Sequence, residues 1–156
     1  MKSLALSFVL VCVLFTGPRC VKSSICTPNP ASSELATIQA FASTNGITTT
    51  AHSSGLHYEI INQGSGATAT SNSIIYITYI GEFLDGVPFD QQSNYASTGW
   101  KLNELIEGWI VGIPLIQEGG RIKLIVPSSM AYGCRGYAGI PGNTVLYFDI
   151  TLVDVQ

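Results

Sequence analysis

The side chains that could do acid–base, metal or covalent chemistry are few in this sequence and stand apart from one another. There are two histidines, His52 in an expected linker and His57 on the expected outward face of a strand. No His-Glu-x-x-His or paired-cysteine motif indicates a metal site, and residues 64–66 lack the ending of a phosphate-binding loop. Cys134 has no evident base, and no serine-hydrolase elbow occurs. We therefore expect no metal and no cofactor, and either a binding module or an enzyme that needs no acid or base.

Aromatic residues are the other group that could form a site. Each of them alone is most simply explained by core packing. Together they could line an apolar cleft with a few polar tips, which is the general form of a ligand site. The set is Tyr79, Phe83, Phe89, Trp100, Trp109, Tyr132, Tyr137, Tyr147 and Phe148.

An apolar–polar repeat of two residues predicts the strands that must position these rings. In a strand, alternate side chains face the same side of the sheet, so one set faces the core. Asp85-Gly86 predicts a hairpin turn after the strand at 74–83. The expected inward sets are Leu56, Tyr58 and Ile60; Ile75, Ile77 and Tyr79; Ile122, Leu124 and Val126; and Leu146, Phe148, Ile150 and Leu152.

One helix is expected within the same domain, at residues 102–116. Leu105, Ile106, Trp109 and Ile113 are spaced by three and four, and glycines and a proline keep the helix short. An antiparallel sheet with one short apolar helix can bury both by curling around it. The fold class that follows is α+β, a curled half-barrel sheet around one short helix, over residues 55–156.

Composition excludes several classes of protein. The chain has 156 residues, which suits one domain with a short extension. Hydrophobic residues make up 46%, which argues against wholesale disorder. Charged residues make up only 11% and the net charge is -3, so the basic surface of a nucleic-acid binder is missing.

The first twenty residues have the pattern of a secretory signal. A positive start precedes an apolar run at 4–15, which is too short to span a membrane. We therefore expect export to the periplasm or cell envelope. Two outcomes stay open: Cys20 becomes the lipidated N-terminus of a lipoprotein, or an ordinary signal is cleaved nearby. The polar tether after Cys20 favours the first, and Arg19 departs from its usual pattern.

The cysteines add one open question. Cys12 leaves with the signal in either case. If Cys20 is lipidated, Cys26 and Cys134 are the only thiols left, and an oxidising compartment favours their pairing. Sequence spacing gives no distance between them, so a disulfide and two free thiols both stay open.

Residues 21–54 are expected to be a tether followed by a short helix. One such helix offers little surface for self-association, and we expect a monomer with the helix as an appendage. Its expected features are a cap at Ser32 or Ser33, one apolar face made of Leu35, Ile38 and Phe41, and a stop at Asn45-Gly46.

Ordered sequence blocks over residues 55–156 resemble the successive signatures of the FKBP-type peptidyl-prolyl cis/trans isomerases. A single Tyr-x-Gly would carry little weight, but many blocks in family order are a specific signal. They are Tyr79-Ile80-Gly81, DGVPFD at 85–90, LIEGW at 105–109, GGRIKLIVP at 119–127, Ala131-Tyr132-Gly133, Ile140-Pro141 and LYFDI at 146–150.

The resemblance implies an active cleft between the sheet and the short helix. Trp109 would form its floor, while the Tyr132 hydroxyl and the Ile106 backbone N–H would bind ligand carbonyls. Asp90 would orient Tyr79, or else cap the turn after Phe89. Proline-containing polypeptides would be substrates and the macrolides of the family inhibitors. The implied cleft residues are Tyr79, Phe89, Asp90, Leu105, Ile106, Trp109, Tyr132, Ile140 and Phe148.

Several positions depart from the family pattern. Gly142 stands where a second proline is common, which would loosen the loop. Tyr137 and the neighbouring Cys134 are unusual, and the segment 91–99, part of the cleft rim, is short. The resemblance implies an exported prolyl isomerase. The alternative is a proline-segment-binding chaperone module with little or no turnover; an adhesive or sugar-binding β domain has no support from the blocks.

Overall fold

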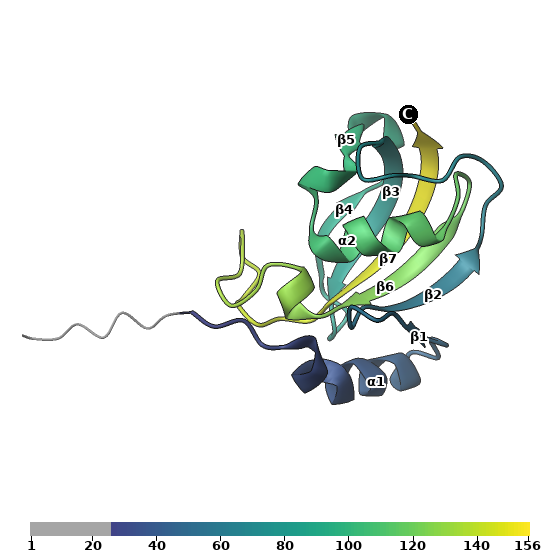
Figure 1. Cartoon of the computed structure of the whole chain (residues 1–156). Helices are drawn as coiled ribbons and strands as arrows, with labels where there is room; N and C mark the ends of the chain where they lie inside the picture. Colours follow the sequence, from purple (N-terminus) through teal and green to yellow (C-terminus); the bar gives the residue numbers. More distant parts are fainter. Residues whose placement is uncertain (1–25) are drawn as a thin grey trace, which may run out of the picture.

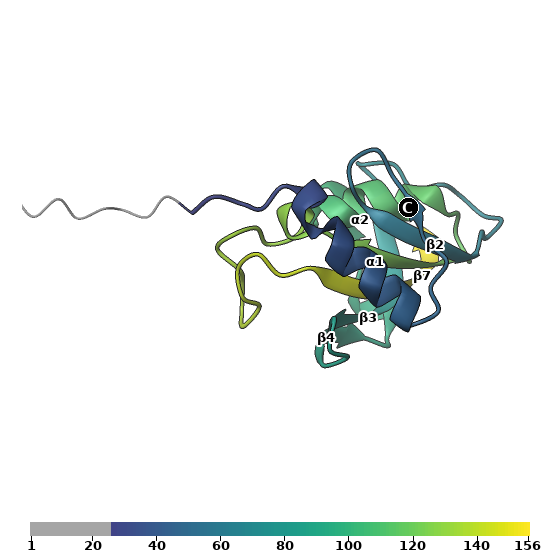
Figure 2. The same ribbon diagram turned by 90° about the horizontal axis from the view of Figure 1, so that it is seen from below.

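The computed structural model describes residues 26–156 (Figure 1). The expected signal at 1–20 and the cysteine proposed for lipidation lie outside these residues. None of the helices from residue 26 onward is long and apolar enough to cross a membrane. The chain forms one curled sheet with a short helix against each of its two faces (Figures 1 and 2).

The sheet has seven strands, all antiparallel, as the sequence predicts. Their order is β1-β2-β6-β7-β3-β4, and β5 pairs with the first two residues of β3. The longest strands, β3 and β7, are central and pair along their length. The bounds are β1 Thr50–Ala51, β2 His57–Asn62, β3 Ile74–Phe83, β4 Pro88–Gln92, β5 Trp100–Lys101, β6 Arg121–Val126 and β7 Leu146–Val155.

Helix α2, Glu107–Gly112, lies across the inner face of the sheet (Figure 1). It is shorter than the helix expected at 102–116. Single 3-10 turns precede and follow it, at Leu102–Glu104 and Ile113–Leu115. Leu105 and Ile106 have extended backbone between the first turn and the helix, so they are not helical as expected. Pro114, which lacks an amide hydrogen, lies in the following turn.

Glycines let α2 approach the sheet closely. A Cβ on Gly108 would lie 2.5 Å from Cγ1 of Val126, and one on Gly112 would lie 2.8 Å from both methyl carbons of Leu124. The two glycines therefore do more than limit the helix length. They allow the helix backbone to lie directly on β6.

The main core fills the space between α2 and the inner face of the sheet. The inward sets contribute most of it, as expected, although Tyr58 and Tyr79 are only partly buried and Ile60 is exposed. The fully buried side chains here are Leu56, Ile75, Ile77, Leu102, Ile113, Ile116, Ile122, Leu124, Val126, Leu146, Ile150 and Leu152.

Helix α1, Leu35–Thr44, covers the outer face of the sheet (Figure 2). A 3-10 turn at Ala31–Glu34 precedes it, and no side chain caps either start, so the expected serine cap is wrong. The helix stops at Asn45, and Gly46 has a φ of +62°, as the Asn-Gly pair predicts. Thus the helix forms at the expected place.

The same helix is not the expected appendage, because it buries a second apolar cluster. Ile38 and Ala42 of α1 pack on Ile125 and Tyr147, two residues from the expected outward face of the sheet. His57, also expected to face outward, is only 6% exposed. Alternation along a strand identifies two faces, but only the packing of α1 shows that both are covered.

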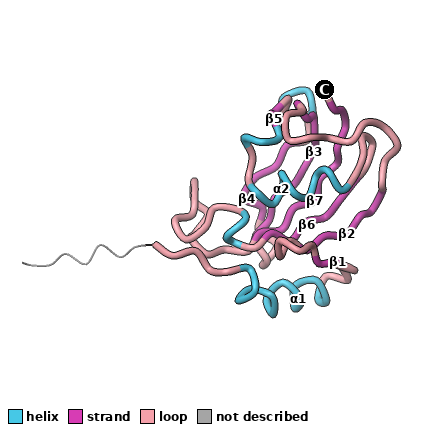
Figure 3. Tube along the Cα trace, viewed as in Figure 1, coloured by secondary structure: helices cyan, strands magenta, loops and turns pink. Residues whose placement is uncertain are grey.

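A disulfide joins Cys26 to Cys134, whose Cα atoms lie 5.7 Å apart across 108 residues of sequence. It decides the question that the cysteine count left open. Cys134 lies in the connection between β6 and β7, which has little regular structure (Figure 3). The beginning of the described chain is thus fixed to this connection.

Candidate functional site

A cavity of about 570 Å³ lies between α2, the inner face of the sheet and the β6–β7 connection. Its wall is mostly aromatic and aliphatic, with a few polar tips. The lining residues are Ile74, Tyr79, Asp90, Gly99, Trp100, Lys101, Glu104, Leu105, Ile106, Trp109, Tyr132 and Phe148.

Trp109 of α2 forms the floor and is held by rings on three sides. Tyr79 and Phe148 meet it edge-on, with ring centroids 5.0 Å and 5.2 Å away. Trp100 stacks on it at 6.5 Å. Edge-on and offset stacked arrangements are the favoured geometries of aromatic pairs. The indole is therefore fixed in place at 5% exposure.

Tyr79 and Asp90 form the polar side of the cavity. The Tyr79 hydroxyl donates a hydrogen bond of 2.6 Å to Oδ2 of Asp90, as the first of the two interpretations of Asp90 requires. Burial raises the pKa of the Tyr79 phenol, and the hydrogen bond and negative charge of Asp90 raise it further. This phenol stays protonated at physiological pH.

Tyr132 comes from the β6–β7 connection and stands against an exposed ring. Its ring stacks on that of Tyr137, with centroids 5.3 Å apart and planes 13° from parallel. Tyr137 itself is 65% exposed. Burial and the charge of Asp90 raise the pKa of Tyr132. The second phenol of the cavity is therefore also a neutral donor.

Leu105 and Ile106 line the cavity at the entrance to α2. The carbonyl of Ile106 accepts hydrogen bonds from the amides of Trp109 and Ile110, at 2.9 Å and 3.1 Å. These bonds fix the Ile106 peptide relative to the floor. Ile106 is therefore an extended residue directly before the helix that lines the cavity.

Two residues of the implied cleft do not line the cavity. Phe89 lies behind Phe148, which it meets edge-on at 5.6 Å, and it also packs on Phe83. Ile140 is buried in the main core, at 8% exposure. Phe89 thus contacts a wall residue, and Ile140 belongs to the core. The remaining implied residues meet at the cavity.

Other lining residues were not assigned to the site from the sequence. Trp100 belongs to the aromatic set, but no strand was predicted around it. β5 pairs Trp100 with Ile75 and so brings it to the cavity. Four further lining residues come from the same part of the fold: Ile74, Gly99, Lys101 and Glu104. The short 91–99 segment, expected to leave the rim uncertain, leads directly into this wall.

Gly142 lies at a close backbone approach within the β6–β7 connection. A Cβ at this position would lie 2.0 Å from the carbonyl oxygen of Cys134. The absence of a side chain at Gly142 therefore permits two backbone segments of the β6–β7 connection to approach closely. The amides and carbonyls of Tyr137 and Ile140 also pair across this connection.

The cavity combines mostly aromatic and aliphatic walls with the neutral phenol of Tyr132 and with the charged residues Asp90, Lys101 and Glu104. From residue 26 to the C-terminus, no cluster of three or more histidine, cysteine, aspartate or glutamate residues is placed to hold a metal ion.

A model of the FKBP-type peptidyl-prolyl cis-trans isomerase domain matches residues 66–153. The chain belongs to the FKBP family.

Curated FKBP relatives support this membership. The FKBP-type peptidyl-prolyl cis-trans isomerase FkpA of Escherichia coli strain K12 is 35% identical over 119 residues, which is 76% of this chain and 43% of the relative. A probable FkpA of Neisseria meningitidis serogroup B is 37% identical over 116 residues, 73% of this chain and 42% of the relative. The chain thus spans less than half the length of these proteins.

Two solved structures have a similar fold. The crystal structure of FkpA from Escherichia coli superposes with a TM-score of 0.69 at 31% identity, covering 81% of this chain and 61% of that one. A peptidyl-prolyl cis-trans isomerase of Pseudomonas syringae pv. tomato gives 0.67 at 25% identity, covering 83% of this chain and 98% of that one. The curled sheet around α2 is therefore the FKBP arrangement.

Proposed function

We propose that this protein is a peptidyl-prolyl cis/trans isomerase acting on proline-containing segments of exported proteins. The observation that carries the proposal is the cavity itself, an aromatic hollow with Trp109 as its floor and phenols at its edge. Membership of the FKBP family supports the same activity.

The reaction suits a site without acid–base groups. Rotation about an X–Pro bond crosses a barrier of about 20 kcal/mol because it breaks amide resonance. A thousandfold acceleration needs only about 4 kcal/mol of selective binding to the twisted amide. The twisted amide has less charge separation than the planar one, so an apolar cavity favours it more than water does.

Each side chain has a role in this proposal. The prolyl ring would lie on Trp109, between the walls formed by Tyr79 and Phe148. The Tyr132 hydroxyl and the Ile106 backbone N–H would donate to carbonyls that flank the proline and so fix its orientation. Asp90 would hold Tyr79 in place through the hydrogen bond of 2.6 Å.

A protease-coupled assay with prolyl peptides tests the proposal. We expect acceleration by the wild type, and a loss of about twofold to tenfold in kcat/KM for Tyr132→Phe, the size expected for one neutral hydrogen bond. Tyr147→Phe is the matched control, because this tyrosine lies under α1 on the opposite face of the sheet. A macrolide ligand of the family should compete with the peptide.

The pH dependence provides a second criterion. Burial raises the pKa of both cavity phenols, so neither loses its proton in the neutral range. We expect kcat/KM to be nearly constant between about pH 6 and pH 8. A steep bell-shaped profile in this range would contradict the mechanism. Saturable binding of a proline peptide without acceleration would instead favour the chaperone module.

Export is part of the proposal. The signal-like sequence at 1–20 and the disulfide between Cys26 and Cys134 both support an oxidising compartment such as the periplasm. The mass of the mature N-terminus distinguishes the two outcomes. An acylated fragment that starts at Cys20 indicates a lipoprotein, and an unmodified fragment indicates plain cleavage.

A further inference from the structure

Glu34 is a buried carboxylate that the proposed reaction does not use. It ends the 3-10 turn before α1 and is only 6% exposed. Its two oxygens accept the backbone N–H of Ser128 at 2.7 Å and the Ser128 hydroxyl at 2.6 Å. The side-chain amide of Asn29 approaches at 3.4 Å. Neither of the two ion pairs among residues 26–156 includes Glu34.

Ser128 transmits this contact to the peptide units around Tyr132. Its backbone carbonyl accepts the amide of Ala131 at 3.1 Å and the amide of Gly133 at 2.8 Å. These residues directly precede and follow Tyr132 in the chain. The position of Ser128 therefore determines where the backbone of Tyr132 lies, and with it the cavity-lining phenol.

The segment before α1 also contacts the β6–β7 connection at positions that follow Tyr132 in the sequence. Cys26 is bonded to Cys134, and the backbone N–H of Asn29 donates to Oδ1 of Asn143 at 3.2 Å. The amide of Asn143 in turn donates to the Gly133 carbonyl at 2.8 Å. Figures 1 and 2 show the two segments side by side in both views. The loop that carries Tyr132 is thus held along its length.

We propose that Glu34 is a positioning residue for Tyr132, acting through its hydrogen bonds to Ser128. This inference rests on the proposed isomerase function for its activity readout. Hydrogen bonds to a charged acceptor are stronger than neutral ones, and a buried donor that loses its acceptor is unfavourable. Loss of the carboxylate would release Ser128 and let the 131–133 segment move away from its position at the cavity.

The conservative variant Glu34→Gln tests this inference. Its amide keeps one acceptor oxygen but presents an NH₂ group to the other donor and removes the charge. We expect kcat/KM to fall by about threefold to fivefold, no more than in Tyr132→Phe, since the effect acts through that hydroxyl. Ser128→Ala, which removes only the hydroxyl, should give a smaller fall and remains usable if Glu34→Gln folds poorly.

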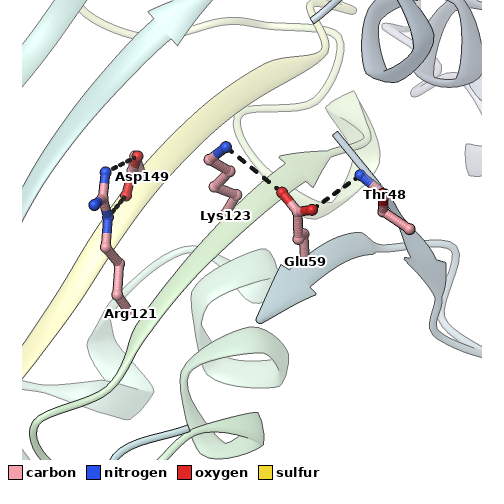
Figure 4. Close-up of polar contacts among 5 residues, drawn as sticks. All are labelled: Thr48, Glu59, Arg121, Lys123 and Asp149. Carbon is pink, nitrogen blue, oxygen red and sulfur yellow. Dashed lines mark hydrogen bonds and ion pairs between the residues drawn. The ribbon is translucent and has the colours of Figure 1, made fainter. Parts of the chain in front are cut away.

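The matched control is Glu59→Gln. Glu59 also accepts a backbone amide from the segment after α1, that of Thr48 at 3.0 Å, and it pairs with Lys123 (Figure 4). These contacts lie on the outer face of the sheet, away from the cavity. Glu59→Gln is expected to lower the unfolding midpoint and leave kcat/KM unchanged.

A double-mutant cycle separates positioning from general destabilisation. In a Tyr132→Phe background, Glu34→Gln should have almost no further effect on kcat/KM, because the hydroxyl that it positions is gone. Equal fold losses in both backgrounds would overturn the inference. An inactive wild type would refute the proposed function instead.

Amide hydrogen exchange tests the inference without turnover. Exchange at Ala131 and Gly133 should be at least several-fold faster in Glu34→Gln than in Glu59→Gln, compared at equal global stability. Unchanged exchange at both amides would overturn the inference, whether or not the wild type is active.

Discussion

His57 is a residue whose protonation opposes folding. It lies under the segment that follows α1, and its Nδ1 is 3.5 Å from the hydroxyl of Thr49. Burial lowers the pKa of His57 below the value of 6.5 expected in the unfolded chain. At a pH between the pKa of folded His57 and 6.5, the unfolded chain binds more protons than the folded one. Acid therefore favours unfolding.

We therefore predict that stability is full above about pH 6.5 and falls as the pH drops through the pKa of folded His57. Urea unfolding at pH 7.5 and at pH 5.5 measures the difference. His57→Gln should reduce the difference, whereas the control His52→Gln should retain it. A difference of the same size in both variants would show that other groups cause the pH dependence.

Single side chains also show where sequence reasoning succeeded. The types and order of the blocks around Tyr79, Trp109 and Tyr132 indicated a shared cleft, and the structure brings these residues to one cavity. Phe89 and Ile140 belong to the same series of blocks but do not line the cavity: Phe89 packs on the wall residue Phe148, and Ile140 is buried in the core. Whether a ring faces a cavity or supports its wall depends on rotamers and neighbours, which sequence order does not specify.

At the scale of elements, the close contact between α2 and β6 depends on glycine. The Cβ of an alanine at Gly108 would lie 2.5 Å from Cγ1 of Val126, a fully buried β-branched residue. Glycine to alanine gains up to about 1 kcal/mol of helix propensity. Overpacking of a rigid neighbour costs about 1–3 kcal/mol, so the unfavourable effect should dominate.

We predict that Gly108→Ala lowers the free energy of unfolding by about 1–2 kcal/mol, as measured by urea denaturation. Val126→Ala creates space at the same contact and is itself destabilising. The double variant should therefore be more stable than the sum of the two single losses implies. Strict additivity would show that the contact is not the cause.

Elements also show what the sequence could not determine. A repeat of two predicted the strands correctly because side-chain alternation is a property of each strand alone. The helix at 102–116 was predicted too long, because apolar residues spaced by three and four do not reveal that Leu105 and Ile106 have extended backbone. The cover over Ile125 and Tyr147 comes from α1, a segment distant in sequence.

For the whole molecule, the disulfide closes a covalent loop that spans most of the described residues. Cys26 and Cys134 are 108 residues apart, so the bond restricts most of the unfolded chain. We predict that reduction, or the variant Cys26→Ser with Cys134→Ser, lowers stability by up to about 5 kcal/mol, as the chain-entropy model gives for loops of this size. An unchanged urea midpoint with and without reductant would contradict this prediction.

Both tryptophans of the chain stand in the same cavity, Trp109 in its floor and Trp100 stacked on it at 6.5 Å. Indole emission shifts with the polarity and hydration around the ring. All tryptophan fluorescence of this protein therefore comes from residues beside the proposed proline-binding position. Intrinsic tryptophan fluorescence should therefore report whether the cavity is occupied, and ligand titrations can be followed without any added label.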